Sequence, residues 1–169
     1  LGGRVTSWIR KGDSYSDTGD YGNDNVFVPY TGVLYDLTDD HRIYVSYAET
    51  FNPQNKQDEN DKLLDPLEGK TYEAGLKSSY LNNMLQTSVS IFKVDQDNVA
   101  VQTGVHPDDA ARAVYAAAEN VSSEGYELEV IGQPIKGLNI NAGYSEFKVK
   151  ADDSVSLDVN TNQPRKQAN

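Results

Sequence analysis

The sequence predicts an all-β fold in which antiparallel strands follow one another up and down, and three observations support this prediction. Seven stretches alternate apolar and polar residues with the two-residue period of a strand. The connections between these stretches alternate between short and long. Only 37% of the 169 residues are hydrophobic, and Tyr (11) outnumbers Phe (4), which is lean for a soluble β-domain that must fill a shared core.

The clearest strand pair lies in residues 70–98. Before the turn at Asn82 and Asn83, the apolar face carries Tyr72, Ala74, Leu76, Ser78 and Tyr80, and the polar face carries Glu73, Gly75, Lys77 and Ser79. Asparagine tolerates positive φ, which suits a tight hairpin. Leu85, Thr87, Val89 and Ile91 continue the apolar face after the turn. The alternation weakens at Phe92 and Val94, which indicates a bulge or the approach to a loop.

The other strand-like stretches follow the same pattern. All seven lie near residues 2–10, 27–37, 42–51, 70–81, 85–99, 123–133 and 138–149. The short connections are residues 37–42, 82–84 and 133–137, and the long ones are 11–26, 52–69, 100–122 and 150–165. Every long connection therefore falls at the same end of the predicted sheet.

This arrangement of connections is typical of outer-membrane barrels, which have short periplasmic turns and long extracellular loops. A soluble meander has no reason to place all its long loops at one end. The sequence therefore predicts an antiparallel up-and-down transmembrane β-barrel segment, with about seven strands of a larger barrel that do not close alone. A soluble sandwich with decorated loops remains the alternative, because composition does not separate the two.

In a barrel, the apolar face of each strand contacts lipid and the polar face lines the lumen. The residues expected to face lipid are Ile43, Val45, Tyr47, Tyr126, Leu128, Val130, Leu138, Ile140, Ala142 and Tyr144. Those expected to face the lumen are Arg42, Tyr44, Ser46, Ala48, Glu127, Glu129, Asn139, Asn141, Gly143 and Ser145. Glu127 and Glu129 on one strand would be costly in a dry core but are tolerable in a wet or filled lumen.

Aromatic residues lie where the two membrane interfaces are expected. Tyr35 and Tyr80 are beside short turns, and Tyr47, Phe51, Tyr72 and Tyr126 are nearer the long loops. Two interfacial girdles are therefore predicted. The simpler explanation for any single tyrosine is that tyrosine favours strands.

Charge and composition exclude several classes of protein. The net charge of −11 disfavours binding to nucleic acid, and the absence of cysteine leaves no disulfide or thiolate metal site. No run of about eighteen apolar residues is present to form a transmembrane helix. No catalytic or nucleotide-binding motif is found, so we predict that the protein is not an enzyme and needs no cofactor.

The remaining candidates for chemistry are weak. His41 and His106 have no ligand-spaced neighbours and are interpreted as surface residues. Residues 13–25 contain four aspartates that offer oxygen ligands for calcium, but their spacing is not that of an EF-hand loop, so a solvated loop and no metal site are predicted, as for residues 58–65. In residues 106–119, Pro107 and two aspartates before an Ala-rich run favour a short helix or a mobile loop equally.

Several motifs resemble consecutive strands of TonB-dependent ferric-siderophore receptors. These are Pro29-Tyr30-Thr31-Gly32, Phe51-Asn52-Pro53-Gln54, the run Pro66 through Lys77 (Pro-x-x-Gly-x-x-Tyr-Glu-x-Gly-x-Lys), and Gln96-Asp97-Asn98. They cover nearly the whole chain in the same order and spacing. The sequence is most similar to the receptors for hydroxamate-type siderophores such as coprogen, rhodotorulic acid and pyoverdine.

The resemblance implies a receptor in which an N-terminal plug lies inside a barrel of roughly 22 strands. Residues 1–169 would then be one partial, C-terminal barrel domain, with the plug, the TonB-coupling segment and the remaining strands outside this chain. Both ends of the sequence look cut, which agrees with a piece of a longer protein. The implied location is the outer membrane, and the implied partners are a ferric siderophore, the TonB complex and outer-membrane lipid.

The family lines its siderophore pocket with aromatic residues from the plug apex, the upper barrel wall and the extracellular loops. The aromatic residues nearest the long loops here are Trp8, Tyr15, Tyr21, Phe51 and Tyr115, which are the ligand-binding candidates. Packing within girdles or loops is the competing role for most of them. Three hypotheses follow: a receptor barrel segment, a soluble ligand-binding or adhesive β-domain and, least favoured, an outer-membrane enzyme.

Overall fold

The described part of the chain forms one large antiparallel sheet and one small hairpin. The computed structural model describes residues 1–10, 21–151 and 165–168. The large sheet has eight strands in the order β1-β2-β3-β4-β5-β8-β9-β10, and β6 pairs with β7 separately. The strands are β1 (Gly2–Arg10), β2 (Tyr21–Asp36), β3 (His41–Asn52), β4 (Leu67–Tyr80), β5 (Leu85–Asp97), β6 (Val99–His106), β7 (Asp109–Ala118), β8 (Val121–Ile135), β9 (Leu138–Lys150) and β10 (Arg165–Ala168).

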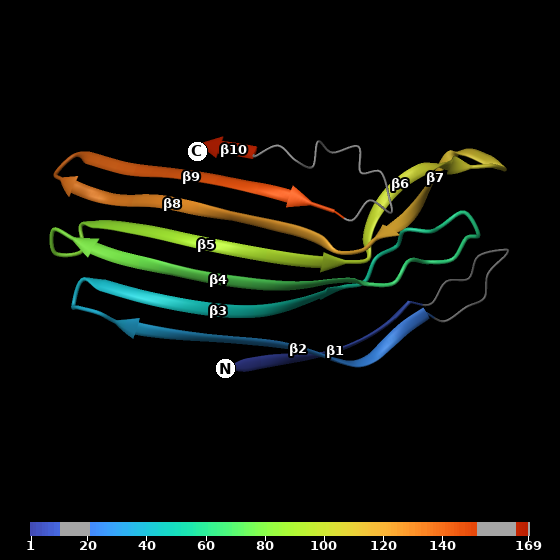
Figure 1. The fold of residues 1–169 in the computed structure, drawn as a ribbon, viewed down its shortest axis with the longest axis horizontal. Coiled ribbons are helices and arrows are strands. Elements are labelled where there is room, and N and C mark those ends of the chain that lie inside the picture. The colour runs from blue at the N-terminus through green and yellow to red at the C-terminus, as the bar shows by residue number, and fades with distance from the viewer. Residues whose placement is uncertain (11–20, 152–164, 169) are drawn as a thin grey trace.

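The large sheet is a single open layer. Its neighbouring strands follow the chain order, apart from the β6–β7 insertion, and β1 and β10 form its two edges in the described residues. The three short turns lie together at the left end in Figure 1, and residues 53–66 and the β6–β7 hairpin lie at the right end. The predicted all-β fold, with antiparallel strands in an unclosed sheet, is confirmed.

The connection predicted for residues 100–122 is where the structure differs most from expectation. Residues 99–118 form the β6–β7 hairpin, and the helix considered for residues 106–119 is wrong. The Ala-rich run pairs as a strand with β6, from Val99 opposite Ala118 to His106 opposite Asp109. Alanine is the strongest helix former, but intrinsic propensity is a weak preference, and pairing with a Val-rich neighbouring strand overrides it here. No helix in the described residues is long and apolar enough to cross a membrane.

The β4–β5 hairpin has a continuous register. The pairing runs without interruption from Glu68 opposite Asp97 to Tyr80 opposite Leu85. The bulge suggested near Phe92 and Val94 is therefore wrong. Because Phe92 lies opposite Glu73, these two residues keep the strand period and belong to the polar face.

The turn of this hairpin depends on positive φ angles. Leu81, Asn82 and Asn83 have φ of 55°, 55° and 66°, and the Met84 N–H donates to the Leu81 carbonyl at 3.2 Å. The neighbouring strand approaches closely, since the Gln133 N–H donates to the Met84 carbonyl at 2.7 Å. A Cβ on Gly132 would lie 2.1 Å from that carbonyl oxygen, so only glycine fits there.

Little apolar surface is buried. Within the described residues, the buried hydrophobic side chains are Val28, Phe51, Val114, Ala118 and Val121. Meanwhile Val33, Val45 and Ile91 are 69%, 61% and 63% exposed. A soluble protein would cover these side chains with a second layer, so the exposed apolar face marks a contact surface.

Candidate functional site: the two faces of the sheet

The apolar face is built by rows of residues that lie opposite one another on successive strands. Ile43 pairs with Leu76, Leu76 with Val89, and Val89 with Leu128. The next row toward the short turns contains Ser78, Thr87, Val130 and Ala142. Residues opposite one another share a face, so the sets of residues predicted to share a face do so in the structure.

Tyrosines border this apolar face at the long-loop end. The rings of Tyr47 and Tyr72 lie 5.1 Å apart, and those of Tyr126 and Tyr144 lie 6.1 Å apart. The hydroxyls of Tyr126 and Tyr144 both donate to Oε2 of Glu146, at 2.8 and 2.9 Å. An apolar ring with a polar tip suits the boundary between lipid and water. From the sequence, Tyr144 was predicted to face lipid but was not included among the tyrosines of this border.

The border at the short-turn end is formed around Tyr80. Its ring lies edge-on to the His41 ring at 5.7 Å, and His41 Nδ1 lies 2.8 Å from the Ser78 hydroxyl. His41 therefore packs at the end of the apolar face. His106 is the last residue of β6, and its Nδ1 accepts a hydrogen bond from the Asp108 N–H at 3.2 Å. Neither histidine belongs to a metal-binding group among the described residues.

Beyond the long-loop tyrosines, the same face becomes charged. Lys93 pairs with Asp95 at 2.8 Å and Lys150 with Glu124 at 2.7 Å. Oppositely charged residues also lie opposite one another across strands: Glu49 and Lys70, Lys70 and Asp95, Lys93 and Glu124, and Glu124 and Lys148. Such pairs stabilise a solvated sheet surface. The apolar band therefore ends at the tyrosines.

The polar face has a compact cluster around Tyr44. The Tyr44 ring covers Gly75, where a Cβ would lie 2.5 Å from its Cε1 atom. The Tyr44 hydroxyl donates to Glu73, and Lys77 Nζ lies 5.1 Å from the ring centroid. A tyrosine lying over a cross-strand glycine fills the space that the glycine leaves open on the sheet.

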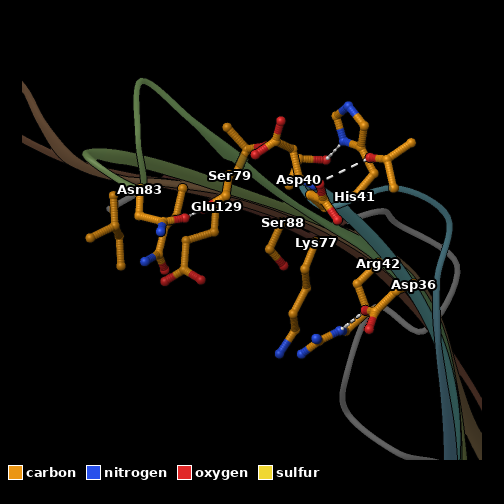
Figure 2. A pocket seen from close by; sticks show the side chains of 15 residues that line it. Asp36, Asp40, His41, Arg42, Lys77, Ser79, Asn83, Ser88 and Glu129 are labelled. Atoms are coloured by element: carbon orange, nitrogen blue, oxygen red, sulfur yellow. Dashed lines mark hydrogen bonds and ion pairs between the residues drawn. The ribbon is translucent and has the colours of Figure 1, made fainter.

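This polar cluster continues toward the short turns into an open pocket of about 390 Å³. Arg42 forms an ion pair with Asp36, and Lys77, Ser88 and Glu129 extend the charged and polar lining. Figure 2 shows Arg42, Lys77 and Glu129 on one side of the sheet and His41 on the other. This surface can bind charged and polar groups.

Replacing Gly75 by Ala tests whether the Tyr44 cluster stabilises the wall. The new methyl group would displace the Tyr44 ring and break its bond to Glu73, so we expect a loss of about 1–3 kcal/mol in folding free energy. Gly143 is the matched control, because it lies on the same face opposite Glu129 and its Cβ would meet an atom only at 3.8 Å. Denaturant titrations of the full receptor in vesicles measure both. Equal losses for both variants would contradict this role of Tyr44.

The four aromatic ligand candidates in the described part of the chain lie at or near the long-loop end, in different settings. Trp8 lies on β1 opposite Asn23, beside a register shift. Phe51 is near the end of β3 and is 5% exposed. Tyr115 lies on β7 and contacts Lys56. Tyr15 lies outside the described residues, as do Asp13, Asp17 and Asp20 of the calcium alternative, and Tyr21 begins β2. The structure thus brings together the long-loop residues 53–66 with Tyr115.

One sheet layer that is apolar on one face, bordered by tyrosines and polar on the other face is the wall of a transmembrane β-barrel. The chain belongs to the family of TonB dependent receptor-like β-barrels, which matches residues 1–169. It is therefore a segment of an outer-membrane barrel, with its apolar face toward lipid and its polar face toward the lumen.

Parts of several known siderophore receptors are similar to this chain. It is 40% identical over 179 residues to the ferric-pyoverdine BN7/BN8 receptor of Pseudomonas putida, covering 98% of this chain and 20% of that receptor. The outer-membrane ferripyoverdine receptor of Pseudomonas aeruginosa, solved with ferripyoverdine, matches at a TM-score of 0.78 and 30% identity, over 99% of this chain and 22% of that one. The alcaligin outer-membrane receptor of Bordetella pertussis matches at a TM-score of 0.71 and 34% identity, over 98% of this chain and 29% of that one. The chain thus spans about a fifth to less than a third of these relatives' lengths.

Proposed function

We propose that this segment is part of a receptor that binds a ferric siderophore and imports it across the outer membrane with energy supplied through TonB. The observation that supports this most is the two-faced wall, because an uncovered apolar face opposite a charged, wet face fits a barrel that surrounds a lumen. The family membership and the pyoverdine and alcaligin receptors among the relatives support the same class of ligand. In this proposal the receptor moves its ligand without changing it, so it is not an enzyme.

We propose further that residues 1–169 lie in the C-terminal part of the receptor, and that the plug, the TonB-coupling segment and the closing strands lie outside this chain. The basis for this is the order of motifs from Pro29 to Asn98, together with the short coverage of the relatives. The same motifs support a hydroxamate-type siderophore. Sequence upstream should encode a plug, and sequence downstream further amphipathic strands.

The ligand contacts are proposed to come from aromatic residues at the mouth of the barrel. The candidates are Trp8, Tyr15, Tyr21, Phe51 and Tyr115. Aromatic rings present a large rigid surface, which suits the capture of a bulky chelate. Of the described candidates, Phe51 is the most covered, so its substitution should act mainly through packing.

Growth on defined iron chelates tests the proposal. Cells that lack their own siderophores and carry the full-length receptor should grow on ferric pyoverdine or another ferric hydroxamate, and deletion of TonB should abolish that growth. A catecholate siderophore is the control for ligand class. Growth that is independent of the receptor with every chelate would reject the function, and growth on catecholates alone would reject the hydroxamate assignment.

A further inference from the structure

Two segments at the long-loop end that are far apart in the sequence are joined to each other. The Tyr115 N–H on β7 donates to the Gln57 carbonyl at 2.9 Å. Lys56 Nζ donates to the Tyr115 hydroxyl at 3.3 Å and lies 4.6 Å from the centre of its ring. Arg112 forms an ion pair with Asp61. Residues 53–66 and the β6–β7 hairpin therefore share backbone, aromatic and ionic contacts.

Residues 53–66 have their own internal order. Gln57 and Leu63 form a β-bridge, the Leu64 N–H donates to the Lys56 carbonyl at 2.9 Å, and the Asp58 N–H donates to the Lys62 carbonyl at 2.9 Å. Asp58 Oδ1 accepts from the N–H groups of Asn60 and Lys62 at 2.8 and 2.9 Å, which closes the turn. The hydrogen bond from the Tyr115 N–H thus joins β7 of the hairpin to the short antiparallel element in residues 53–66.

Both segments are also tied together at their base. Gln54 Nε2 donates to the Asn98 carbonyl at 2.8 Å, and Asn98 Nδ2 donates to the Pro66 carbonyl at 2.9 Å. Val114 and Ala118 on β7 are 8% and 1% exposed. This end of the molecule therefore holds a small core that most of the sheet lacks.

We propose that residues 53–66 and the β6–β7 hairpin open and close as one body, the paired-loop unit, and that Tyr115 and Arg112 are positioning residues that hold its two halves in register. Contacts of this kind make a cooperative unit of local unfolding, because the opening of either half breaks every bond that joins the two. At the barrel mouth, such a unit presents one fixed surface to the ligand. The role at the barrel mouth rests on the proposed function, whereas the contacts that join the two segments do not. The proposal gives Tyr115 a second role in addition to ligand contact.

Amide hydrogen exchange of the full-length receptor, in detergent and without ligand, tests whether the paired-loop unit opens as one body. Peptides from residues 54–64 and 100–117 should share one opening equilibrium. Tyr115→Ala should accelerate exchange in both by a similar factor of about five to ten, because it removes the aromatic contact and the hydroxyl bond to Lys56. Gln102→Ala is the matched control, since the exposed Gln102 lies opposite Tyr115 on β6 and should leave residues 54–64 unchanged. Acceleration confined to the hairpin, or different opening equilibria in the unaltered receptor, would overturn the proposal.

Swapping the charges of Arg112 and Asp61 distinguishes a contact between the two segments from a role of Arg112 within its own hairpin. Each of Arg112→Asp and Asp61→Arg should accelerate exchange in both segments by about two- to fivefold, as expected for an exposed ion pair, and the double variant should restore the original rates. No restoration would overturn the role assigned to Arg112.

Binding of ferric pyoverdine to the same variants tests separately whether the two segments are coupled and whether that coupling affects ligand binding. The affinity should fall in Tyr115→Ala and Arg112→Asp and recover in the Arg112/Asp61 double variant. Coupled exchange with unchanged affinity would overturn the positioning role in binding while leaving the paired-loop unit intact. Coupled exchange in a receptor that binds no ferric siderophore would reject the proposed function instead.

Discussion

Arginine in place of Leu76 or Ile140 will lower the folding free energy of the full receptor in lipid vesicles by about 2–4 kcal/mol, the cost of a cation on the lipid face near the bilayer midplane. Leu76 lies on β4 midway between Tyr72 and Tyr80, which border the apolar band at its two ends. Ile140 precedes Tyr144 on β9 by the same interval that separates Leu76 from Tyr72. Leu76 is therefore far from either polar boundary, and Ile140 lies as far along its strand from the long-loop tyrosine border as Leu76 does.

The controls for this prediction are residues on the opposite face of the same strands. Asn141 follows Ile140 on β9 and lies opposite Ile131 on the polar face, and Ser79 lies on the polar face of β4, three residues from Leu76 toward the short turn. Arginine at Asn141 or Ser79 should cost little, because its guanidinium reaches the wet lumen. Equal penalties on both faces in folding titrations would show that the sheet is oriented differently.

The chain expressed alone will not be a stable soluble monomer. Its sheet has two edges, β1 and β10, whose outward N–H and C=O groups have no strand beside them in the described residues. Its apolar face also has no covering layer, with Val33, Val45 and Ile91 more than half exposed. In water these surfaces should pair with other copies, so the chain should need detergent or the rest of its barrel.

Sedimentation of the isolated chain in plain buffer measures this directly. We expect aggregates or oligomers in buffer and dispersal in detergent. A compact monomer that unfolds cooperatively would support the soluble ligand-binding or adhesive β-domain instead, because only a closed or two-layered structure buries these apolar rows without lipid.

Most strands of the wall could be predicted because one physical signal, the two-residue alternation, runs along them. β1 has the predicted bounds, whereas β2 begins at Tyr21 instead of residue 27 and β4 at Leu67 instead of residue 70. The short strand β10 was not among the seven predicted stretches. The β6–β7 hairpin was missed because the two-residue alternation is absent from β7. Ala113 to Ala118 offers no contrast between its two faces, and the pairing that makes it a strand comes from β6 and from Gln57.

The functional surfaces were predicted unevenly. Glu127 and Glu129 were assigned to the polar face from alternation alone, and the register agrees. The contact between Lys56 and Tyr115 joins positions that no local pattern connects, so only the folded structure reveals it. Local pattern thus identifies which face a residue occupies, whereas contacts between loops depend on tertiary geometry.

The staggered tyrosines also measure the inclination of the wall. Tyr72 on β4 lies in the row that continues through Lys93 and Glu124 to Lys148 on β9, but Tyr144 lies four residues from Lys148, toward the short turns. Three steps between strands of about 4.8 Å and four residues of about 3.3 Å give an angle of about 40°. If the tyrosines follow one level membrane surface, the strands lean by that angle from the membrane normal, within the range of about 35–45° for outer-membrane barrels. The eight-residue interval from Tyr72 to Tyr80 then spans a vertical height of about 20 Å, close to the apolar band of about 25 Å in such barrels.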